Sequence, residues 1–142
     1  MIVRTAVAAA VALTPAAGPA APPPNPFVSS QTMAGQALEV PEGPLQVSVA
    51  SSVFQTGDVI ATHMHFWSRY VFVQSGTVEV TLIDQGITQT FSKGQVIVEP
   101  IGLWHKGRII AGPATLISME QVPPGRVNKI EPPACNCPPP RP

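Results

Sequence analysis

The sequence is poor in charged residues and has no basic run. Asp, Glu, Lys and Arg make up 11% of the 142 residues, and eight basic residues balance eight acidic ones. Aromatic residues do not alternate with Lys or Arg along any predicted strand, as they do on many nucleic-acid-binding surfaces. We therefore expect no nucleic-acid partner.

No apolar run approaches the ~20 residues that a membrane-spanning helix needs. The N-terminal run, residues 6–13, is short, follows Arg4 and precedes small residues up to Ala20. This order is typical of a secretory signal peptide. We predict that residues 1–20 are such a peptide and that the protein is secreted or periplasmic, without a membrane anchor. A cytoplasmic protein with an uncleaved Ala/Pro arm is the alternative.

Cysteine is nearly absent. The two cysteines, Cys135 and Cys137, lie in the segment ACNCPPPRP. Export would permit a disulfide between them, although a ring closed by Cys-x-Cys is tight. A soft-metal site or an interchain thiol is the functional alternative. We expect an accessory, non-catalytic segment.

Proline is scarce in the middle of the chain and dense at both ends. Of 18 prolines, six lie in residues 15–26 and eight in residues 123–142. Proline-dense segments lack backbone donors and favour linkers. We therefore predict a linker and N-terminal arm over residues 21–44, one folded domain over residues 45–122, and a tail over residues 123–142.

The predicted domain shows no amphipathic helical pattern bounded by capping residues. It consists of short apolar runs separated by turn residues. Val78, Val80 and Leu82 alternate with polar residues, as do Val47 and Val49, which is the pattern of half-buried strands. The candidate strands are residues 45–54, 58–66, 69–76, 77–84, 87–91, 95–100, 107–111 and 114–122. Many short strands at close spacing predict an all-β antiparallel sandwich or barrel.

The three histidines suggest a metal site. His63 and His65 are two residues apart in a predicted strand, so both side chains leave the same face. His105 is the third histidine of the predicted domain. If it converged with the other two, the three imidazoles would form most of a tetrahedral site or half of an octahedral one for a divalent cation. Ordinary buried core histidines are the alternative.

Glycine and proline recur around these histidines at a characteristic spacing. GDVIATHMHFWSRYVFVQSG (residues 57–76) is followed after 17 residues by GQVIVEPIGLWH (residues 94–105). These segments resemble the two signature motifs of the cupin superfamily. The resemblance implies an antiparallel jelly-roll β-barrel, the double-stranded β-helix, in which His63, His65 and His105 hold a divalent metal such as Fe, Mn, Ni or Zn. Cupin relatives are often homodimers.

The chain departs from the cupin pattern at Arg69, where the family has glutamate. A guanidinium has donors only and stays charged, so it cannot ligate a cation. Three interpretations follow. The histidines alone hold the metal and Arg69 binds an anionic group of the substrate; or Glu99 is the surrogate carboxylate or pairs with Arg69; or metal binding is lost and the pocket binds an anion.

Aromatic residues flank the histidines in the sequence. We assign Trp67, Tyr70 and Trp104, together with Arg69, as substrate-binding residues that wall a pocket for a small molecule. Ordinary packing around a small barrel is the alternative for the three aromatics.

The motifs favour a metal-dependent, dioxygenase-like protein that acts on a small anionic or aromatic molecule. Three neutral histidines leave positions on Fe(II), or a similar ion, for substrate and O₂. The alternative is a non-catalytic cupin that binds a small molecule or anion and has lost or does not need the metal. An isomerase or lyase with a metal-polarised carbonyl is a third candidate.

Overall fold

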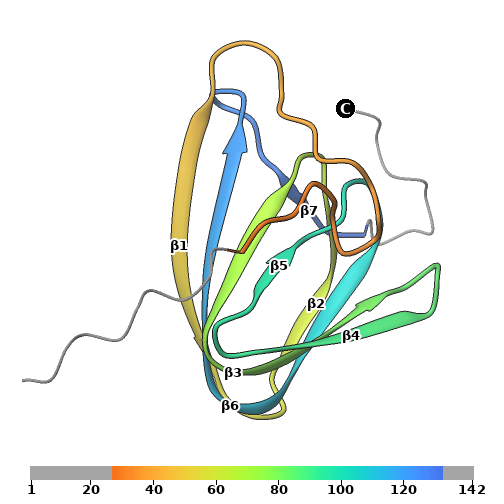
Figure 1. Ribbon diagram of the computed structural model, residues 1–142, viewed down its shortest axis with the longest axis vertical. Coiled ribbons are helices and arrows are strands. Elements are labelled where there is room, and N and C mark those ends of the chain that lie inside the picture. Colours follow the sequence, from red (N-terminus) through yellow and green to blue (C-terminus); the bar gives the residue numbers. More distant parts are fainter. Residues whose placement is uncertain (1–26, 133–142) are drawn as a thin grey trace, which may run out of the picture.

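A computed structural model describes residues 27–132 and shows an all-β fold (Figure 1). The predicted signal peptide and both cysteines lie outside the described residues. Within residues 27–132 no helix is long and apolar enough to span a membrane. The strands are β1 (Gln46–Phe54), β2 (Val59–His65), β3 (Arg69–Leu82), β4 (Ile87–Ser92), β5 (Val96–Val98), β6 (His105–Val122) and β7 (Lys129–Ile130).

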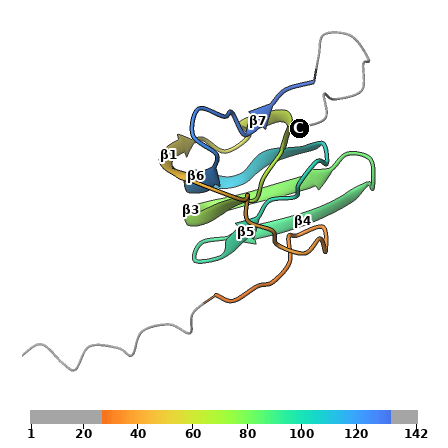
Figure 2. The ribbon, with the colours of Figure 1, turned by 90° about the horizontal axis from the view of Figure 1, so that it is seen from above.

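Two long strands, β3 and β6, form the centre of the fold. They pair antiparallel from Arg69↔Glu120 to Leu82↔His105. Strand β1 pairs with the C-terminal half of β6, and β2 pairs with its N-terminal half. Strands β5 and β4 pair in the same way with the two halves of β3. From above, β1, β6 and β3 lie side by side, with β4 next to β3 (Figure 2). This antiparallel arrangement confirms the predicted jelly-roll fold.

The bend in β3 corrects the predicted strand boundaries. Residues 69–76 and 77–84 were expected as two strands, but β3 runs through Gly76 with shifts of register on both sides of it. Gly76 has a φ of 77°, and a Cβ there would lie 2.5 Å from the Cβ of Ala114 on β6. Gly76 therefore makes a bulge that lets two bent strands approach closely, not a turn that ends a strand. Residues 107–111 and 114–122 likewise join into the single strand β6.

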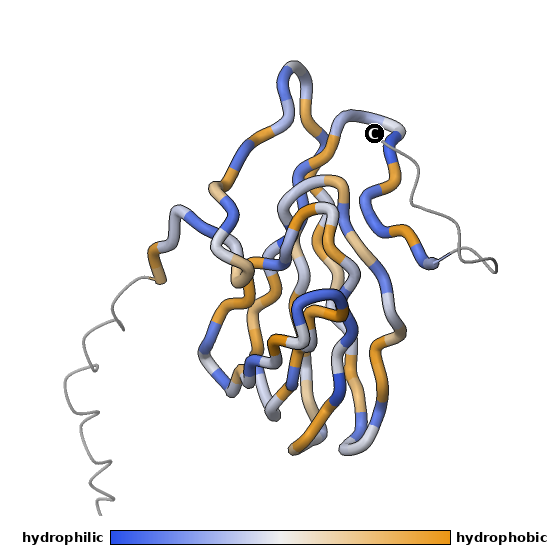
Figure 3. The backbone as a smooth tube through the Cα atoms, turned by 90° about the vertical axis from the view of Figure 1, so that its right-hand side faces the viewer, coloured by the Kyte–Doolittle hydropathy of each residue, from blue (hydrophilic) through white to orange (hydrophobic). Residues whose placement is uncertain are grey.

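The core lies between the two sheet halves and is made by alternating residues of β3, β5 and β6. Figure 3 shows this alternation of hydrophobic and hydrophilic residues along the strands. The predicted pattern of Val78, Val80 and Leu82 is confirmed, since all three are buried. The other central core residues are Val71, Val73, Ile97, Ile109, Ala114 and Leu116.

Strand β1 presents the opposite face from the one its pattern suggests. Val47 and Val49 are 58% and 64% exposed, although the alternation predicts a half-buried face. Ser52 lies opposite Leu116, which is buried, so the face of β1 that carries Ser48 and Ser52 turns inward. Alternation shows which residues share a face, but not which face meets the core.

Segments on both sides of the predicted domain add to the fold. In the N-terminal arm, the Met33 N–H donates to Val98 O at 2.8 Å, and the Gln36 amide bonds the backbone of Ile101 at both N–H and C=O. At the other end, β7 pairs with β2 although it lies in the segment expected to be a tail. The folded unit thus extends past residue 122.

Gly76 and Gly94 form a matched pair for testing the bulge. Both have positive φ, but a Cβ at Gly94 meets nothing within 4 Å. We expect Gly94→Ala to lower the free energy of unfolding by about 1 kcal/mol, from backbone strain alone. Gly76→Ala should cost several kcal/mol more, because it also forces β3 and β6 apart. Urea denaturation measures both, and equal losses would show that the close approach is unimportant.

Candidate metal centre

The register between β2 and β6 brings the three histidines together. His63 lies directly opposite His105, so the two side chains leave the same face of the sheet. His65 is two residues further along β2 and points to that face as well. All three are buried, and their ring centroids are 4.4–5.3 Å apart. The strand pattern predicts the shared face of His63 and His65, and the resemblance to the cupin motifs implies that His105 joins them.

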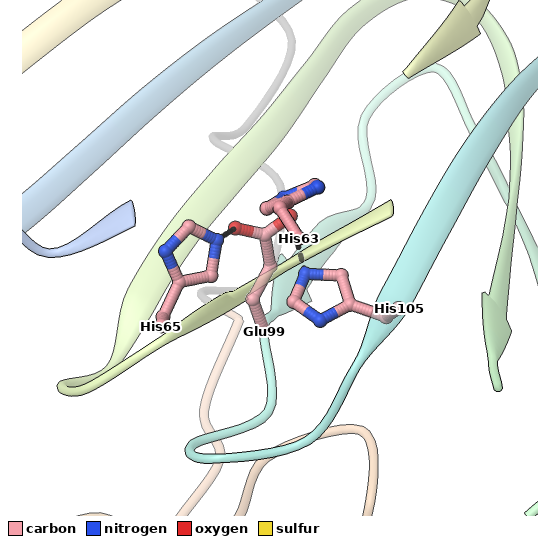
Figure 4. A group of neighbouring side chains, drawn as sticks. All are labelled: His63, His65, Glu99 and His105. Atoms are coloured by element: carbon pink, nitrogen blue, oxygen red, sulfur yellow. Dashed lines mark ion pairs between the residues drawn. The ribbon is translucent and has the colours of Figure 1, made fainter. Parts of the chain in front are cut away.

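A carboxylate completes the group from a fourth position (Figure 4). Glu99 follows β5 and is itself buried. Its Oε2 lies 3.0 Å from His65 Nε2, and its Oε1 lies 3.8 Å from His105 Nε2. One ligand atom from each of the four residues lies within 4.8 Å of the others. The sequence offered this placement of Glu99 only as one of three interpretations.

Backbone carbonyls fix two of the imidazoles in the form that binds metals. His63 Nδ1 lies 2.7 Å from Ala61 O, and His105 Nδ1 lies 2.9 Å from Leu103 O. Since a carbonyl oxygen only accepts, each Nδ1 carries the proton and each Nε2 keeps its lone pair. Such a carbonyl contact is the usual support behind a metal-bound histidine.

Several buried polar atoms of this group make no hydrogen bond. Within residues 27–132, the buried side-chain atoms without one are both ring nitrogens of His65, His105 Nε2, Glu99 Oε2, Arg69 Nε and Ser68 Oγ. Among them, His65 Nε2 and Glu99 Oε2 face each other at 3.0 Å. Buried polar atoms without partners are rare and costly in folded proteins. Ligands ~2.1 Å from a common ion lie ~3.4 Å apart in a tetrahedral site and up to ~4.2 Å apart when they are opposite each other, so some pairs of ligand atoms must approach by about 1 Å. The three imidazoles and one carboxylate therefore fit a divalent cation.

Burial keeps the site in its metal-binding protonation state. Desolvation lowers the pKa of His63 to about 4, against the opposing effect of the Ala61 carbonyl. It also lowers the pKa of His105 below the ordinary value of 6.5. For Glu99, burial acts to raise the pKa, but the short contact with His65 and the charges of His65, His105 and Arg69 outweigh it and lower the pKa to about 2. At neutral pH the site thus offers neutral His63 and His105 beside an ionised carboxylate.

Arg69 lies beside this group and outside the set of ligand atoms. Its Nη2 donates to Ser118 Oγ at 2.8 Å, and its Nε lies 3.7 Å from Glu99 Oε2. The side chain is 24% exposed, so part of the guanidinium faces open space. Ser118 was not singled out in the sequence, although it alternates with Leu116 and therefore shares its inward face. This geometry agrees with the interpretation in which Glu99 is the surrogate carboxylate or pairs with Arg69.

A cavity of about 190 Å³ opens onto the cluster. Its polar end is formed by His63, Glu99, His105 and Arg69. Its walls are mainly apolar, and Lys106 and Lys129 also line it. An apolar cavity with a few charged groups at defined places is the usual design of a small-molecule site.

The predicted aromatic wall is not part of this cavity. Trp67, Tyr70 and Trp104 are absent from its lining among the described residues. Tyr70 follows the inward-facing Arg69 on β3 and therefore points to the other face. Trp67 has the Arg126 guanidinium 5.9 Å from its ring centroid. Their assignment as substrate-binding residues stays a prediction without support from the lining.

Comparison with known proteins identifies the family. A family model described as "Cupin domain" matches residues 51–120, which hold both motifs and the whole metal cluster. The chain belongs to the cupin superfamily. Among curated proteins, no sequence match is found.

Solved cupin structures share the fold at low sequence identity. A protein from Bacillus halodurans is 19% identical, with a TM-score of 0.50 over 58% of this chain and 67% of that one. A variant of oxalate decarboxylase from B. subtilis is 14% identical, with a TM-score of 0.52 over 60% of this chain and 24% of that one. DMSP lyase from Ruegeria pomeroyi is 14% identical, with a TM-score of 0.53 over 63% and 45%. The aligned part is thus less than half of each enzyme chain.

The lowered pKa of His63 predicts that acid destabilises the metal-free protein. The unfolded chain protonates this residue near pH 6.5, whereas the folded protein resists until the pH falls to about 4. The unfolded state binds more protons in this window, so the free energy of unfolding should fall by about 2–3 kcal/mol as the pH drops through it. The lowered pKa of Glu99 acts in the same direction below pH 4.5.

Urea denaturation at several pH values, in the presence of a chelator, measures this slope. His63→Gln removes the titrating group and should flatten the slope between pH 6.5 and 4. An equal slope in the variant and the wild type would contradict the assignment to His63.

Proposed function

We propose that this cupin holds a divalent cation through His63, His65, Glu99 and His105 and acts on a small anionic molecule bound beside it. The observation that carries the proposal is the convergence of four buried residues whose ligand atoms all lie within 4.8 Å of one another. Relative to the usual cupin pattern, the carboxylate comes from the second motif, and the position it left in the first motif is occupied by Arg69.

Each residue of the site has a separate task in this proposal. The carbonyls of Ala61 and Leu103 hold two imidazoles in the correct orientation. The apolar walls exclude water, which strengthens every charge interaction in the cavity. Arg69 is fixed by Ser118 at one nitrogen and presents the rest of its fork of donors to an anionic group. A bound cation would supply Lewis-acid chemistry or, if it were iron, oxygen activation.

The dioxygenase-like reaction predicted from the motifs remains the reaction that we propose. Within the cavity the only carboxylate is Glu99, and as a ligand it is not free to act as a general base. This favours oxygen chemistry over hydrolysis. An oxygen-uptake screen of small carboxylic acids with iron-loaded protein tests the reaction class directly.

One observation favours a second function, an anion-binding barrel without metal. The Nε of Arg69 lies 3.7 Å from Glu99 Oε2, so the guanidinium can neutralise the buried carboxylate in place of a cation. In that case Glu99 and Arg69 form a structural pair, and the remaining donors of Arg69 bind the anion.

Metal content separates the two functions. If the cluster holds a cation, each substitution that removes a ligand should lower metal affinity at least ~100-fold. Mutation of a residue that only hydrogen-bonds a metal ligand already lowers metal affinity by about 10–100-fold. The substitutions that remove a ligand are His63→Ala, His65→Ala, His105→Ala and Glu99→Gln. Arg69→Ala should retain the metal, because it removes a neighbouring positive charge and no ligand atom.

Elemental analysis of protein purified without added metal, followed by competition with a chelator, gives these affinities. Retention of metal by Glu99→Gln would show that three histidines suffice. If the wild type binds no divalent cation at all, the anion-binding barrel is the correct function.

Arg69 should control affinity for the anion. We expect Arg69→Ala to weaken binding of a small carboxylate by about 1–2 kcal/mol, a value reduced for its partial exposure. Arg69→Lys keeps the charge but loses the fork and should recover only part of the affinity. Arg108→Ala removes a similar charge that does not line the cavity and serves as the control. Titration calorimetry measures all three, and equal affinities would refute this role.

A further inference from the structure

The C-terminal strap, defined here as residues 123–132, lies against the strand that carries the metal ligands. Strand β7 within the strap pairs antiparallel with the end of β2, through Met64↔Ile130 and His65↔Lys129. Directly opposed residues on paired strands point to the same face. Lys129 therefore extends to the same side as His65, and it lines the cavity.

A buried asparagine fixes the strap in this position. Asn128 is 2% exposed, and its Oδ1 accepts from the Trp67 N–H at 2.9 Å. Its Nδ2 donates to Trp67 O at 3.2 Å and to Glu120 Oε2 at 3.0 Å. The Phe66 N–H donates in turn to Asn128 O at 3.3 Å. These bonds tie the strap to the loop between His65 and Arg69, so Lys129 is held at a defined place relative to both.

The charges around the cavity are unequal. Its lining contains the cations Arg69, Lys106 and Lys129 but a single carboxylate, Glu99. Lys106 alternates with the inward His105 and also borders an outer hollow that contains Glu79. A bound divalent cation would make the excess of positive charge larger. The cavity therefore suits a ligand with more than one negative charge.

Lys129 is available for such a ligand. Its Nζ lies 3.3 Å from Glu131 Oε1, and the two side chains are 40% and 67% exposed. An ion pair that is this exposed to water contributes little to stability, so the ammonium group can readily leave Glu131 for another anion. A ligand anion in the cavity competes with Glu131 for the same ammonium group.

We propose that the strap is part of the ligand site and that Lys129 binds a second anionic group of a ligand whose first anionic group is bound at Arg69. The ligand class is a small molecule with two anionic groups, of a size that fits about 190 Å³. The assignment of the first group rests on the function proposed above. The contribution of Lys129 rests independently on the register of β7 and the anchor at Asn128.

Binding of two simple probes tests this inference. Malonate carries two carboxylates and acetate carries one, and calorimetry at low ionic strength gives the affinity of the purified protein for each. We expect Lys129→Ala to weaken malonate binding about two- to tenfold and to leave acetate nearly unchanged. Lys129→Arg should retain malonate binding. Arg69→Ala should weaken both probes.

Because Glu131 pairs with Lys129, a substitution of Glu131 should change malonate affinity in the opposite direction from Lys129→Ala. Glu131→Gln frees the ammonium group and should raise malonate affinity about two- to fivefold. The double variant Lys129→Ala/Glu131→Gln should lose this gain. A strap that is only structural would not produce a gain from Glu131→Gln. Lys93→Ala, on a turn that does not line the cavity, is the control and should change nothing.

The outcomes distinguish this inference from the proposed function. Metal content is measured on the same samples before and after titration. Protein without metal that still prefers malonate through Lys129 would refute the metal function and support the strap. Metal-loaded protein whose malonate affinity is unaffected by Lys129→Ala, or a wild type that binds malonate no better than acetate, would overturn the strap as part of the site.

Discussion

One buried carboxylate, that of Glu99, determines the chemistry of this barrel. An ionised carboxylate inside an apolar cavity is unstable unless positive charge surrounds it. His65, His105 and Arg69 supply partners from three directions, and a cation would supply more. The carboxylate thus orients the groups around it, of which His105 is also held by the Leu103 carbonyl and Arg69 by Ser118. Removing one partner would leave the others with charges or lone pairs that nothing satisfies.

The fold brings these partners together by bending two long strands. β3 carries Arg69 at one end of its length, and β6 carries His105 and Ser118 at positions 13 residues apart. Straight strands would place those two residues about 40 Å apart. The bulge at Gly76, packed against Ala114, lets β3 and β6 curve over the core so that both reach the same cavity. A single close approach of two backbones therefore positions residues from both halves of the jelly roll.

Local periodicity was sufficient for the all-β class and for the shared face of His63 and His65, and the resemblance to the cupin motifs supplied the jelly roll and the place of His105. His63 and His65 share a face of one strand, and the spacing of the two motifs placed His105 beside them. The role of Glu99 did not follow, because its position after β5 leaves its direction open until the sheet is closed. The direction of Val47 and Val49 was unpredictable for a similar reason. Lys129 gave no signal at all, since a two-residue strand after a proline-rich stretch has no periodicity to detect.

The pairing of β1 with the end of β6 has a consequence for how the protein matures. The four residues of the metal cluster are translated before the strap, and β1 must find its partner on β6 across the full width of the domain, as in Gln46↔Val122. Such long-range pairing is slow and cannot begin until the last long strand exists. The site therefore cannot close until residue 122 has been made, after every candidate ligand has been exposed to solvent. If the site binds a cation, the ions present where the chain folds would decide which one enters.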